Sequence, residues 1–306
     1  MEWQSVNFTL TNAQISTDDY NEPLMYEQFY GFACPPFSLA PDPKFFFQGE
    51  THGQAFDLVR YGIERGEGFM VVCGDVGTGK TMLCRTILEE IPKGVYAALI
   101  LNPFLSRTDL LRVILQDFGI LSQRTSSAGK AATAHDLITI LNAFLLSIMQ
   151  LNGRAVLVID EAQKLPVATL EQVRILSNLE TAKQKLLQIV LVGRSELKQL
   201  LARPELRQLS QRVSIRCELK AFSLEQTTAY IRHRMVVASN GKSRALFAPA
   251  ALKIVHRDSR GIPRMINLIA DQCLTAGMTA ASTTIDAALA NQAVKAVELD
   301  SSRWGK

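Results

Sequence analysis

Long apolar runs are absent from this chain of 306 residues. None reaches the ~18 residues that a membrane-spanning helix needs, and residues 1–7 have neither the basic start nor the apolar stretch of a signal peptide. Hydrophobic residues nevertheless make up 47% of the chain and charged residues 20%, which is typical of a globular protein with a sizeable core. We therefore expect a cytoplasmic protein that reaches the inner face of a membrane only through a partner.

Clusters of metal ligands are missing as well. The five cysteines are odd in number and scattered, and no Cys-x-x-Cys pair or Cys/His group has zinc spacing. We expect reduced thiols, as in a cytoplasmic protein, and no metal site built from cysteine and histidine. The histidines, which we expect on the surface or on helix faces, are His52, His135, His233 and His256.

A strong excess of one charge is also lacking. The 33 basic and 29 acidic residues leave a formal net charge of only +4. Domains that bind nucleic acid usually show a clear basic excess. The composition is compatible with nucleic-acid contact but does not argue for it.

One nucleotide-binding motif is complete. Residues 74–81 read Gly-Asp-Val-Gly-Thr-Gly-Lys-Thr and fit the phosphate-binding loop at every fixed position. An apolar strand is expected before the loop at 68–73, and a helix after it at 82–88. Glycines let the loop turn tightly while its N–H groups approach a phosphate, and the helix N-terminus favours the same anion. We predict that the chain binds a nucleoside triphosphate.

The residues of this loop have predicted roles. Lys80 should reach the β- and γ-phosphates, and the Thr81 hydroxyl should ligate Mg²⁺. The predicted nucleotide-binding residues here are Gly74, Asp75, Val76, Gly77, Thr78, Gly79, Lys80, Thr81 and Met82.

Strands and helices alternate beyond the loop. Alternation of this kind is typical of a parallel sheet covered by helices on both faces. From about Phe222 the pattern becomes purely helical, after a capping box that joins Ser223 to Gln226. The expected strands are 95–101, 155–159 and 187–192, and the expected helices are 53–65, 107–118, 136–150 and 169–180.

These patterns predict an α/β domain of the P-loop NTPase class followed by a small all-helical lid. The predicted segments are a flexible arm at 1–24, the nucleotide-binding domain at 25–221, the lid at 222–293 and a tail at 294–306. Residues 26–47 are rich in aromatic residues and proline, which excludes a long helix. We expect their rings to pack onto the core beside the nucleotide rather than form an exposed patch.

Two acids follow the predicted strand at 155–159. A carboxylate at a strand end beside the phosphate loop can hold Mg²⁺ through water, which is the role predicted for Asp160. Glu161 can polarise the attacking water as a general base. Phosphoryl transfer also needs cations near the transition state. The candidates are Arg203, Arg207, Arg212 and Arg216 after the predicted strand at 187–192, and Arg264 in the lid.

The order of phosphate loop, Asp-Glu strand end, arginine segment and Gly-Ile-Pro-Arg at 261–264 resembles that of AAA+ ATPases. It is most similar to the ExeA/GspA group, the ATPases of the general secretion and MSHA-pilus type, over about residues 25–275. The specific motifs include Met-Tyr-Glu-Gln-Phe-Tyr-Gly at 25–31, Val-Ile-Asp-Glu-Ala-Gln at 158–163 and Leu-Arg-Gln-Leu-Ser-Gln-Arg-Val at 206–213. The chain resembles a short form of this group, without a membrane span or a peptidoglycan-binding module.

The resemblance implies roles for several arginines. Arg212 resembles the arginine finger that reaches the γ-phosphate held by a neighbouring subunit, and Arg207 is the reserve candidate. Arg264 resembles the lid arginine called sensor 2. A polar sensor 1 residue is expected after the strand at 187–192, but Arg194 stands where relatives tend to carry glutamine, which leaves sensor 1 open.

The resemblance also implies a function. It implies a ring or filament that hydrolyses ATP with Mg²⁺ and drives assembly or export by a secretion or pilus machine through a membrane-bound partner. The alternative is a DNA-binding AAA+ ATPase of the transposition-regulator type, supported only by a basic stretch at 194–220 that three glutamates dilute. A nucleotide-gated scaffold is a third hypothesis, and Glu161 argues against it because a scaffold needs no base.

Overall fold

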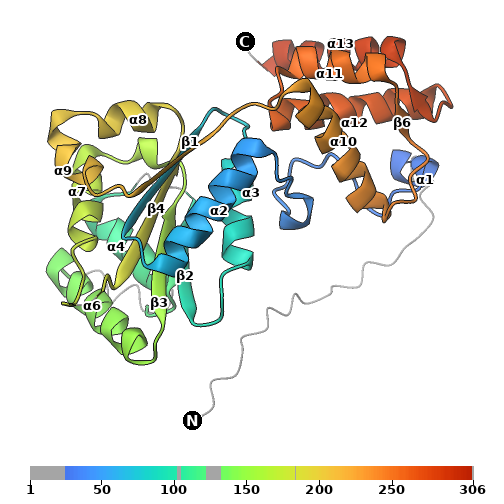
Figure 1. Cartoon of the computed structure of the whole chain (residues 1–306). Helices are drawn as coiled ribbons and strands as arrows, with labels where there is room; N and C mark the ends of the chain where they lie inside the picture. The colour runs from blue at the N-terminus through green and yellow to red at the C-terminus, as the bar shows by residue number, and fades with distance from the viewer. Residues whose placement is uncertain (1–24, 102–104, 122–131, 183, 305–306) are drawn as a thin grey trace.

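The computed structural model describes residues 25–101, 105–121, 132–182 and 184–304. They form an α/β domain and a helical domain that lie side by side (Figure 1). The α/β domain contains a five-stranded parallel sheet in the order β2-β3-β4-β1-β5. The strands are β1 Phe69–Gly74, β2 Val95–Ile100, β3 Arg154–Ile159, β4 Leu187–Gly193 and β5 Ile215–Leu219. The predicted parallel sheet is confirmed.

The central strands are apolar on both faces because both faces are covered. Alternate side chains of one strand, such as Val71 and Val72, enter two different hydrophobic clusters. On one face lie α2 Glu50–Arg65 and α3 Lys80–Glu89. The cluster on the other face includes side chains from α4 Arg107–Asp117, α6 Ala134–Gln150, α7 Val167–Leu176 and α8 Glu196–Leu201. The two layers match the predicted covering by helices.

One strand and one helix end in this domain differ clearly from the sequence prediction. Strand β5 was not predicted, although the alternation of its apolar residues with the charged Arg216 and Glu218 is the pattern of a strand with one buried face. Arg216, predicted to follow the last strand of the sheet, therefore lies within a further strand. Helix α7 ends at Leu176, four residues short of the predicted end, and Glu180 instead pairs with Lys185 in an isolated bridge. Short helices precede β5: η4 Pro204–Leu206 and α9 Arg207–Ser210.

The lid contains four helices among the described residues: α10 Leu224–Ser239, α11 Pro249–Ser259, α12 Pro263–Thr279 and α13 Ala287–Trp304. The capping box of Ser223 and Gln226 starts α10 as predicted. The lid is not purely helical, since β6 Leu246–Phe247 pairs with β7 Thr284–Ile285. The predicted tail at 294–306 is wrong as far as Trp304, because α13 continues through it and Val294 is buried in the lid core. Among the described residues, no helix is long and apolar enough to span a membrane.

The aromatic segment near the N-terminus packs into the lid. Helix α1, Tyr26–Tyr30, and the 3-10 helix η1, Pro43–Phe45, are its regular elements. The hydroxyl of Tyr30 donates to the carbonyls of Leu274 and Ser282, and the ring of Phe37 meets that of Phe247. Most of the rings are buried, as expected, and Phe29 and Phe47 are partly buried. These rings belong to the core of the helical domain, although the sequence prediction placed the segment with the α/β domain. Phe46 instead packs against the α/β core.

Phe222, in the linker between β5 and α10, leaves no room for a side chain at Gly261, which lies between α11 and α12. Gly261 has φ +70°, and an added Cβ would lie 2.0 Å from the carbonyl oxygen of Phe222. The Gly261 carbonyl in turn accepts the Phe222 N–H at 2.8 Å. Gly66 is a matched control, with φ +79° and no neighbour within 4 Å of its added Cβ.

We predict that Gly261→Ala lowers the free energy of unfolding far more than Gly66→Ala. The left-handed backbone costs either alanine about 1–2 kcal/mol, and only Gly261→Ala adds a backbone clash, for a total above about 3 kcal/mol. Urea unfolding of the two variants and the wild type measures this difference. Equal losses would show that the linker backbone moves aside freely.

Candidate functional site

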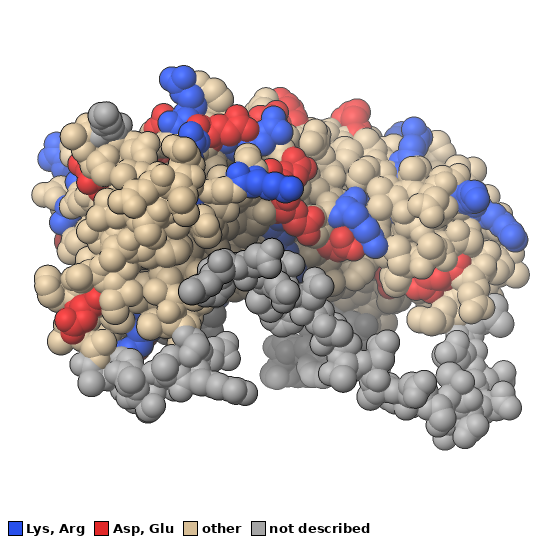
Figure 2. All heavy atoms as spheres, turned by 90° about the horizontal axis from the view of Figure 1, so that it is seen from below, with Lys and Arg blue, Asp and Glu red and all other residues tan. Residues whose placement is uncertain are grey.

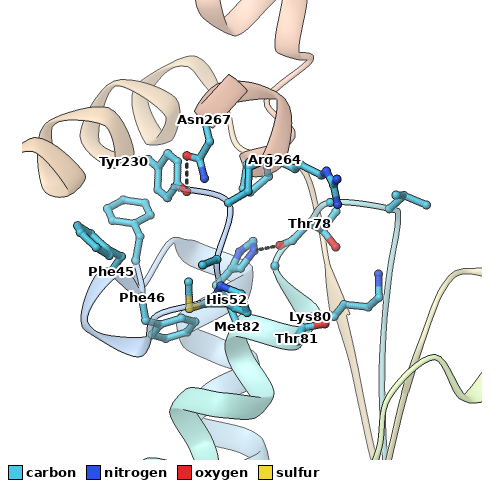
Figure 3. Close-up of a pocket in the computed structure, with 18 of the residues that line it drawn as sticks. Phe45, Phe46, His52, Thr78, Lys80, Thr81, Met82, Tyr230, Arg264 and Asn267 are labelled. Carbon is cyan, nitrogen blue, oxygen red and sulfur yellow. Dashed lines mark hydrogen bonds between the residues drawn. The ribbon is translucent and has the colours of Figure 1, made fainter. Parts of the chain in front are cut away.

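The phosphate loop joins β1 to α3 at the carboxyl edge of the sheet. A cavity of about 370 Å³ lies over it and is walled by both domains. One end of the cavity is formed by the loop itself with Glu161, Arg194 and Arg264. The other end is aromatic, with Phe45, Phe46 and Tyr230 (Figure 3), and Phe47 also lines the cavity. Concave sites of this size with a few polar groups are typical of small-ligand pockets.

The backbone of the loop requires its glycines. Gly77 and Gly79 have φ of +81° and +96°, in the left-handed region. A Cβ on Gly74 would lie 2.8 Å from Thr78 Oγ1 and 2.9 Å from the carbonyl oxygen of Leu219. Successive backbone amides in such a turn form a concave anion site, to which the N-terminus of α3 contributes its unpaired N–H groups. The cradle fits a phosphate.

Lys80 is folded against the loop. Its Nζ donates to the carbonyls of Gly74 at 2.9 Å and Asp75 at 2.8 Å, and the side chain is buried. Burial lowers the pKa of Lys80, against the opposing effect of the Asp160 and Glu161 carboxylates. The ammonium group thus lies beside the cradle with two nearby acids.

Thr81 and Asp160 come together across the sheet. The Thr81 hydroxyl donates to Asp160 Oδ2 at 2.5 Å, and Asp160 Oδ1 accepts the backbone N–H of Glu161 at 2.7 Å. Asp160 is buried at the end of β3. A hydroxyl and a carboxylate are the hard oxygen ligands that suit Mg²⁺. The two residues predicted to hold the metal therefore adjoin.

Glu161 is held by cations. Its Oε2 lies 3.0 Å from Lys164 Nζ, accepts from Gln163 Nε2 at 3.0 Å, and lies 3.6 Å from Arg194 Nε. Burial acts to raise the pKa of Glu161, but Lys164, Arg194 and Gln163 together outweigh it, so the pKa lies below its usual range. The carboxylate is ionised at neutral pH. Its backbone adopts a left-handed φ of +53°, which is uncommon for a residue with a side chain.

Arg194 follows β4 and lines the same cavity. Its backbone N–H donates to Gln163 Oε1 at 3.0 Å, and the next residue, Ser195, donates to Asp75 Oδ1 at 2.8 Å. Within the described residues its buried Nε has no hydrogen-bond partner. The side chain thus points to the cavity at the position where sensor 1 was left open.

Arg264 reaches the cavity from the lid. It lies in the first turn of α12, and its backbone N–H donates to the Gly77 carbonyl at 3.1 Å. In Figure 3 its side chain extends across the loop near Thr78. The lid and the phosphate loop are therefore in direct contact.

The other predicted arginines lie elsewhere in the chain. Arg212, which follows α9, donates at 2.8 Å to Oγ of Ser177, the residue just after α7. Arg207 and Arg216 line a separate surface hollow beside Ser210. None of the three is among the residues that line the nucleotide-sized cavity. The structure brings the loop, Asp160, Glu161, Arg194 and Arg264 together, and it leaves Arg212 and Arg207 outside.

Several lining residues were missed by sequence. His52 was expected on the surface or a helix face, yet it is only 3% exposed and its Nε2 lies 2.6 Å from the Thr78 carbonyl oxygen. Its spacing from Ala55, Phe56 and Val59 on the buried face of α2 was the available signal. Tyr230, Arg234 and Asn267 of the lid also line the cavity, and nothing local in the sequence marks them.

Known proteins share this architecture. A family model described as an AAA domain matches residues 63–201. Among solved structures, the ORC2 protein of Aeropyrum pernix has a TM-score of 0.64 at 15% identity, covering 85% of this chain and 71% of that one. The RuvB branch migration motor of Thermotoga maritima has a TM-score of 0.53 at 19% identity, covering 81% and 68%. At these identities the likeness concerns the fold alone.

A relative of known family is much closer in sequence. General secretion pathway protein A of Aeromonas hydrophila is 41% identical over 283 residues, which are 92% of this chain and 50% of that protein. The chain thus spans about half the length of this relative. With the AAA domain match and the parallel sheet, this identity places the chain in the AAA+ ATPase family, in the ExeA/GspA group of general secretion pathway protein A.

Proposed function

We propose that this chain binds ATP with Mg²⁺ and hydrolyses it between the subunits of a ring or filament, to drive an assembly or export step of a secretion or pilus-type machine. The observation that carries the proposal is the convergence of Lys80, the Thr81–Asp160 pair and Glu161 around one glycine cradle. The Aeropyrum pernix ORC2 protein, which shares the fold, was solved with ADPNP and ADP.

The residues present fit both ATP and its metal. The cradle has no room for a Cβ at Gly74, and the loop amides face an anion. Thr81 and Asp160 would hold Mg²⁺, directly and through water. When bound, Mg²⁺ supplies positive charge that offsets the charge on the phosphate oxygens. The aromatic end of the cavity, with Phe45 and Tyr230, suits a flat nucleobase.

The proposed hydrolysis uses this chain's own groups as follows. Glu161 accepts a proton from a water molecule as the water oxygen bonds to the γ-phosphorus. The bond from that phosphorus to the bridging oxygen breaks, and ADP and inorganic phosphate form. Lys80 exchanges its two carbonyl contacts for phosphate oxygens and stabilises their charge. The low pKa of Glu161 keeps the carboxylate ionised at neutral pH.

A neighbouring subunit would complete this site. Among the described residues of the same chain, Arg194, Arg234 and Arg264 line the cavity, and Arg234 is engaged with Tyr230 and Ser38. Transition-state charge in such enzymes is commonly stabilised by an arginine supplied in trans. Arg212, beyond α7 and away from the cavity, suits that role toward an adjacent copy, with Arg207 in reserve. The secretion machine is proposed from the name of the relative, and the membrane-bound partner from the family likeness.

The charge distribution on one face of the protein does not favour DNA as a partner. On the face shown in Figure 2, basic and acidic side chains are interspersed over both domains. A surface of mixed sign gives little of the counterion release that drives DNA binding.

The Glu161→Gln variant should bind ATP·Mg²⁺ as the wild type does and assemble into larger oligomers, with kcat lowered about 10²- to 10⁴-fold. Light scattering with and without ATP·Mg²⁺ measures the mass, and phosphate release measures kcat. Lys80→Ala serves as the control that loses both binding and assembly. Normal turnover by Glu161→Gln would contradict the role of Glu161 as the general base. Assembly only after duplex DNA is added would favour the DNA-binding alternative.

Mixing two inactive variants tests the arginine in trans. Arg212→Ala keeps an intact phosphate loop, and Lys80→Ala keeps an intact Arg212. Each alone should lose activity by about 10³-fold or more, and the equimolar mixture should recover part of it, because some interfaces then combine a working loop with a working arginine. Arg207→Ala, on the same segment, should stay near wild type. A mixture as inactive as its components contradicts the assignment.

Lys164→Met should raise the pKa of Glu161 toward its usual range, because it removes the ammonium 3.0 Å from Oε2. In the wild type, the lowered pKa keeps Glu161 ionised as the pH falls. In the variant, Glu161 takes up its proton at a higher pH, so the acid limb of the kcat/KM profile should move to higher pH. Carbon-13 NMR titration, with Glu161→Gln for assignment, measures the shift. Lys198→Met, which removes the partner of Glu218 at 2.6 Å, is the control and should leave the acid limb unchanged.

A further inference from the structure

His52 connects the phosphate loop to the linker between the domains. It lies in the first turn of α2, where its Nε2 is 2.6 Å from the Thr78 carbonyl oxygen (Figure 3). Its Nδ1 lies 3.4 Å from Thr51 Oγ1, which accepts the Lys220 N–H at 3.2 Å. The imidazole ring packs on Phe222 with 4.8 Å between centroids. Each edge of this buried ring therefore has a defined neighbour.

The contacts assign the proton on the ring. A carbonyl oxygen only accepts, so Nε2 must carry the hydrogen and donate to Thr78. Nδ1 is then an acceptor, and it faces the hydroxyl of Thr51. Burial lowers the pKa of His52, against a smaller opposite effect of the Thr78 hydrogen bond, which keeps the imidazole neutral near pH 7. A neutral Nε2–H tautomer satisfies both contacts.

The peptide group between Thr78 and Gly79 is thereby fixed in orientation. A trans peptide is planar, and its C=O and N–H point in opposite directions. Because the Thr78 carbonyl points to His52, the Gly79 N–H points away from His52. The side chain of Thr78 is anchored separately, since Oγ1 donates to the Asp75 carbonyl at 2.8 Å. Gly79, with φ +96° and no side chain, would otherwise leave this peptide free to rotate.

We infer that His52 is a positioning residue for nucleotide binding: by holding the Thr78 carbonyl, it aims the Gly79 N–H into the phosphate cradle. This inference rests on the proposed nucleotide site. The contribution is preorganisation, since the amide already faces the anion before the nucleotide arrives. His52 touches the loop and not the reacting atoms, and its effect should appear in binding.

The position of His52 also ties the cradle to the lid linker. Lys220 and Phe222 follow β5 and lead into α10, and Phe222 is bonded through its N–H to Gly261 next to α12. The imidazole of His52 thus contacts the phosphate loop through Nε2, at its edge, and packs with its flat face on Phe222 of the linker. The hydrogen bond and the packing can be separated by substitution.

Two variants separate them. His52→Phe keeps a flat ring for packing on Phe222 but has no donor. His52→Gln keeps an N–H donor in the place of Nε2 but has no ring. The readout is the dissociation constant of a fluorescent ADP analogue with Mg²⁺, measured on the full chain without turnover. We expect binding weakened about 10- to 100-fold in His52→Phe, from the loss of one hydrogen-bonded donor, and within about threefold of wild type in His52→Gln.

Each result has one meaning. Wild-type affinity in His52→Phe overturns the inference, and so does His52→Gln binding as weakly as His52→Phe, because ring shape would then matter and not the donor. Failure of the wild type to bind ATP or ADP overturns the proposed function instead.

A spectroscopic measurement does not depend on the variants folding. Nitrogen-15 NMR of the wild-type imidazole, without nucleotide, should show protonated Nε2 and unprotonated Nδ1. The opposite tautomer would overturn the inference.

Discussion

The parallel direction of the strands determines where this protein can have a site. Because all five strands point the same way, β1, β3 and β4 deliver their carboxyl ends to one edge of the sheet. The chain emerging from β1 forms the glycine loop, that from β3 brings Asp160 and Glu161, and that from β4 brings Arg194. Ligands of open α/β sheets bind at this edge for the same reason. A reversed β3 would place its acids at the opposite edge.

The lid depends on contacts that sequence does not reveal. Arg234 is 1% exposed, yet its partners among the described residues are neutral: the Tyr230 hydroxyl, the Ser38 carbonyl and the ring of Phe45 at 4.5 Å. A buried guanidinium is costly unless its donors are satisfied, and aromatic faces offset part of that cost. Arg234 thereby fastens the segment around residues 38–45 to α10, so one wall of the cavity belongs to the lid.

The same segment is also attached to the α/β domain. Arg85 of α3 donates to the Pro41 carbonyl at 3.2 Å. The aromatic wall is thus held by the lid through Arg234 and by the helix behind the phosphate loop through Arg85. A movement of the lid relative to the sheet must stretch or break one of these attachments. If the cavity binds a nucleotide as proposed, its occupancy and the lid position would be coupled through this wall as well as through Arg264 and His52.

Sequence predicted the parts of the molecule that local pattern determines. The glycine loop, the acids after β3 and the start of α10 each depend on a few adjacent residues, and each lies where it was predicted. Strand β5 has a local signal too, the alternation of apolar and charged residues, and the prediction overlooked it in a run of only five residues. The helical spacing of His52 could have placed it on the buried face of α2, but its partner Thr78 is distant in the chain, as is Ser38, the partner of Arg234. Burial of a polar residue is a property of packing, which local patterns do not encode.

The arrangement of the arginines carries the argument for an oligomer. In this chain Arg194 lies 3.6 Å from Glu161 and Arg264 is anchored to the loop through its own backbone, so both face the cavity from within the subunit. Arg212 instead follows α9 and donates a hydrogen bond to Ser177, the residue that caps the end of α7. If Arg212 acts on a γ-phosphate, that phosphate belongs to another copy, because the intervening α/β core cannot rearrange without losing its packing. Hydrolysis would then report that a neighbour is in place, which is what an ATPase needs if it is to turn over only as part of its assembly.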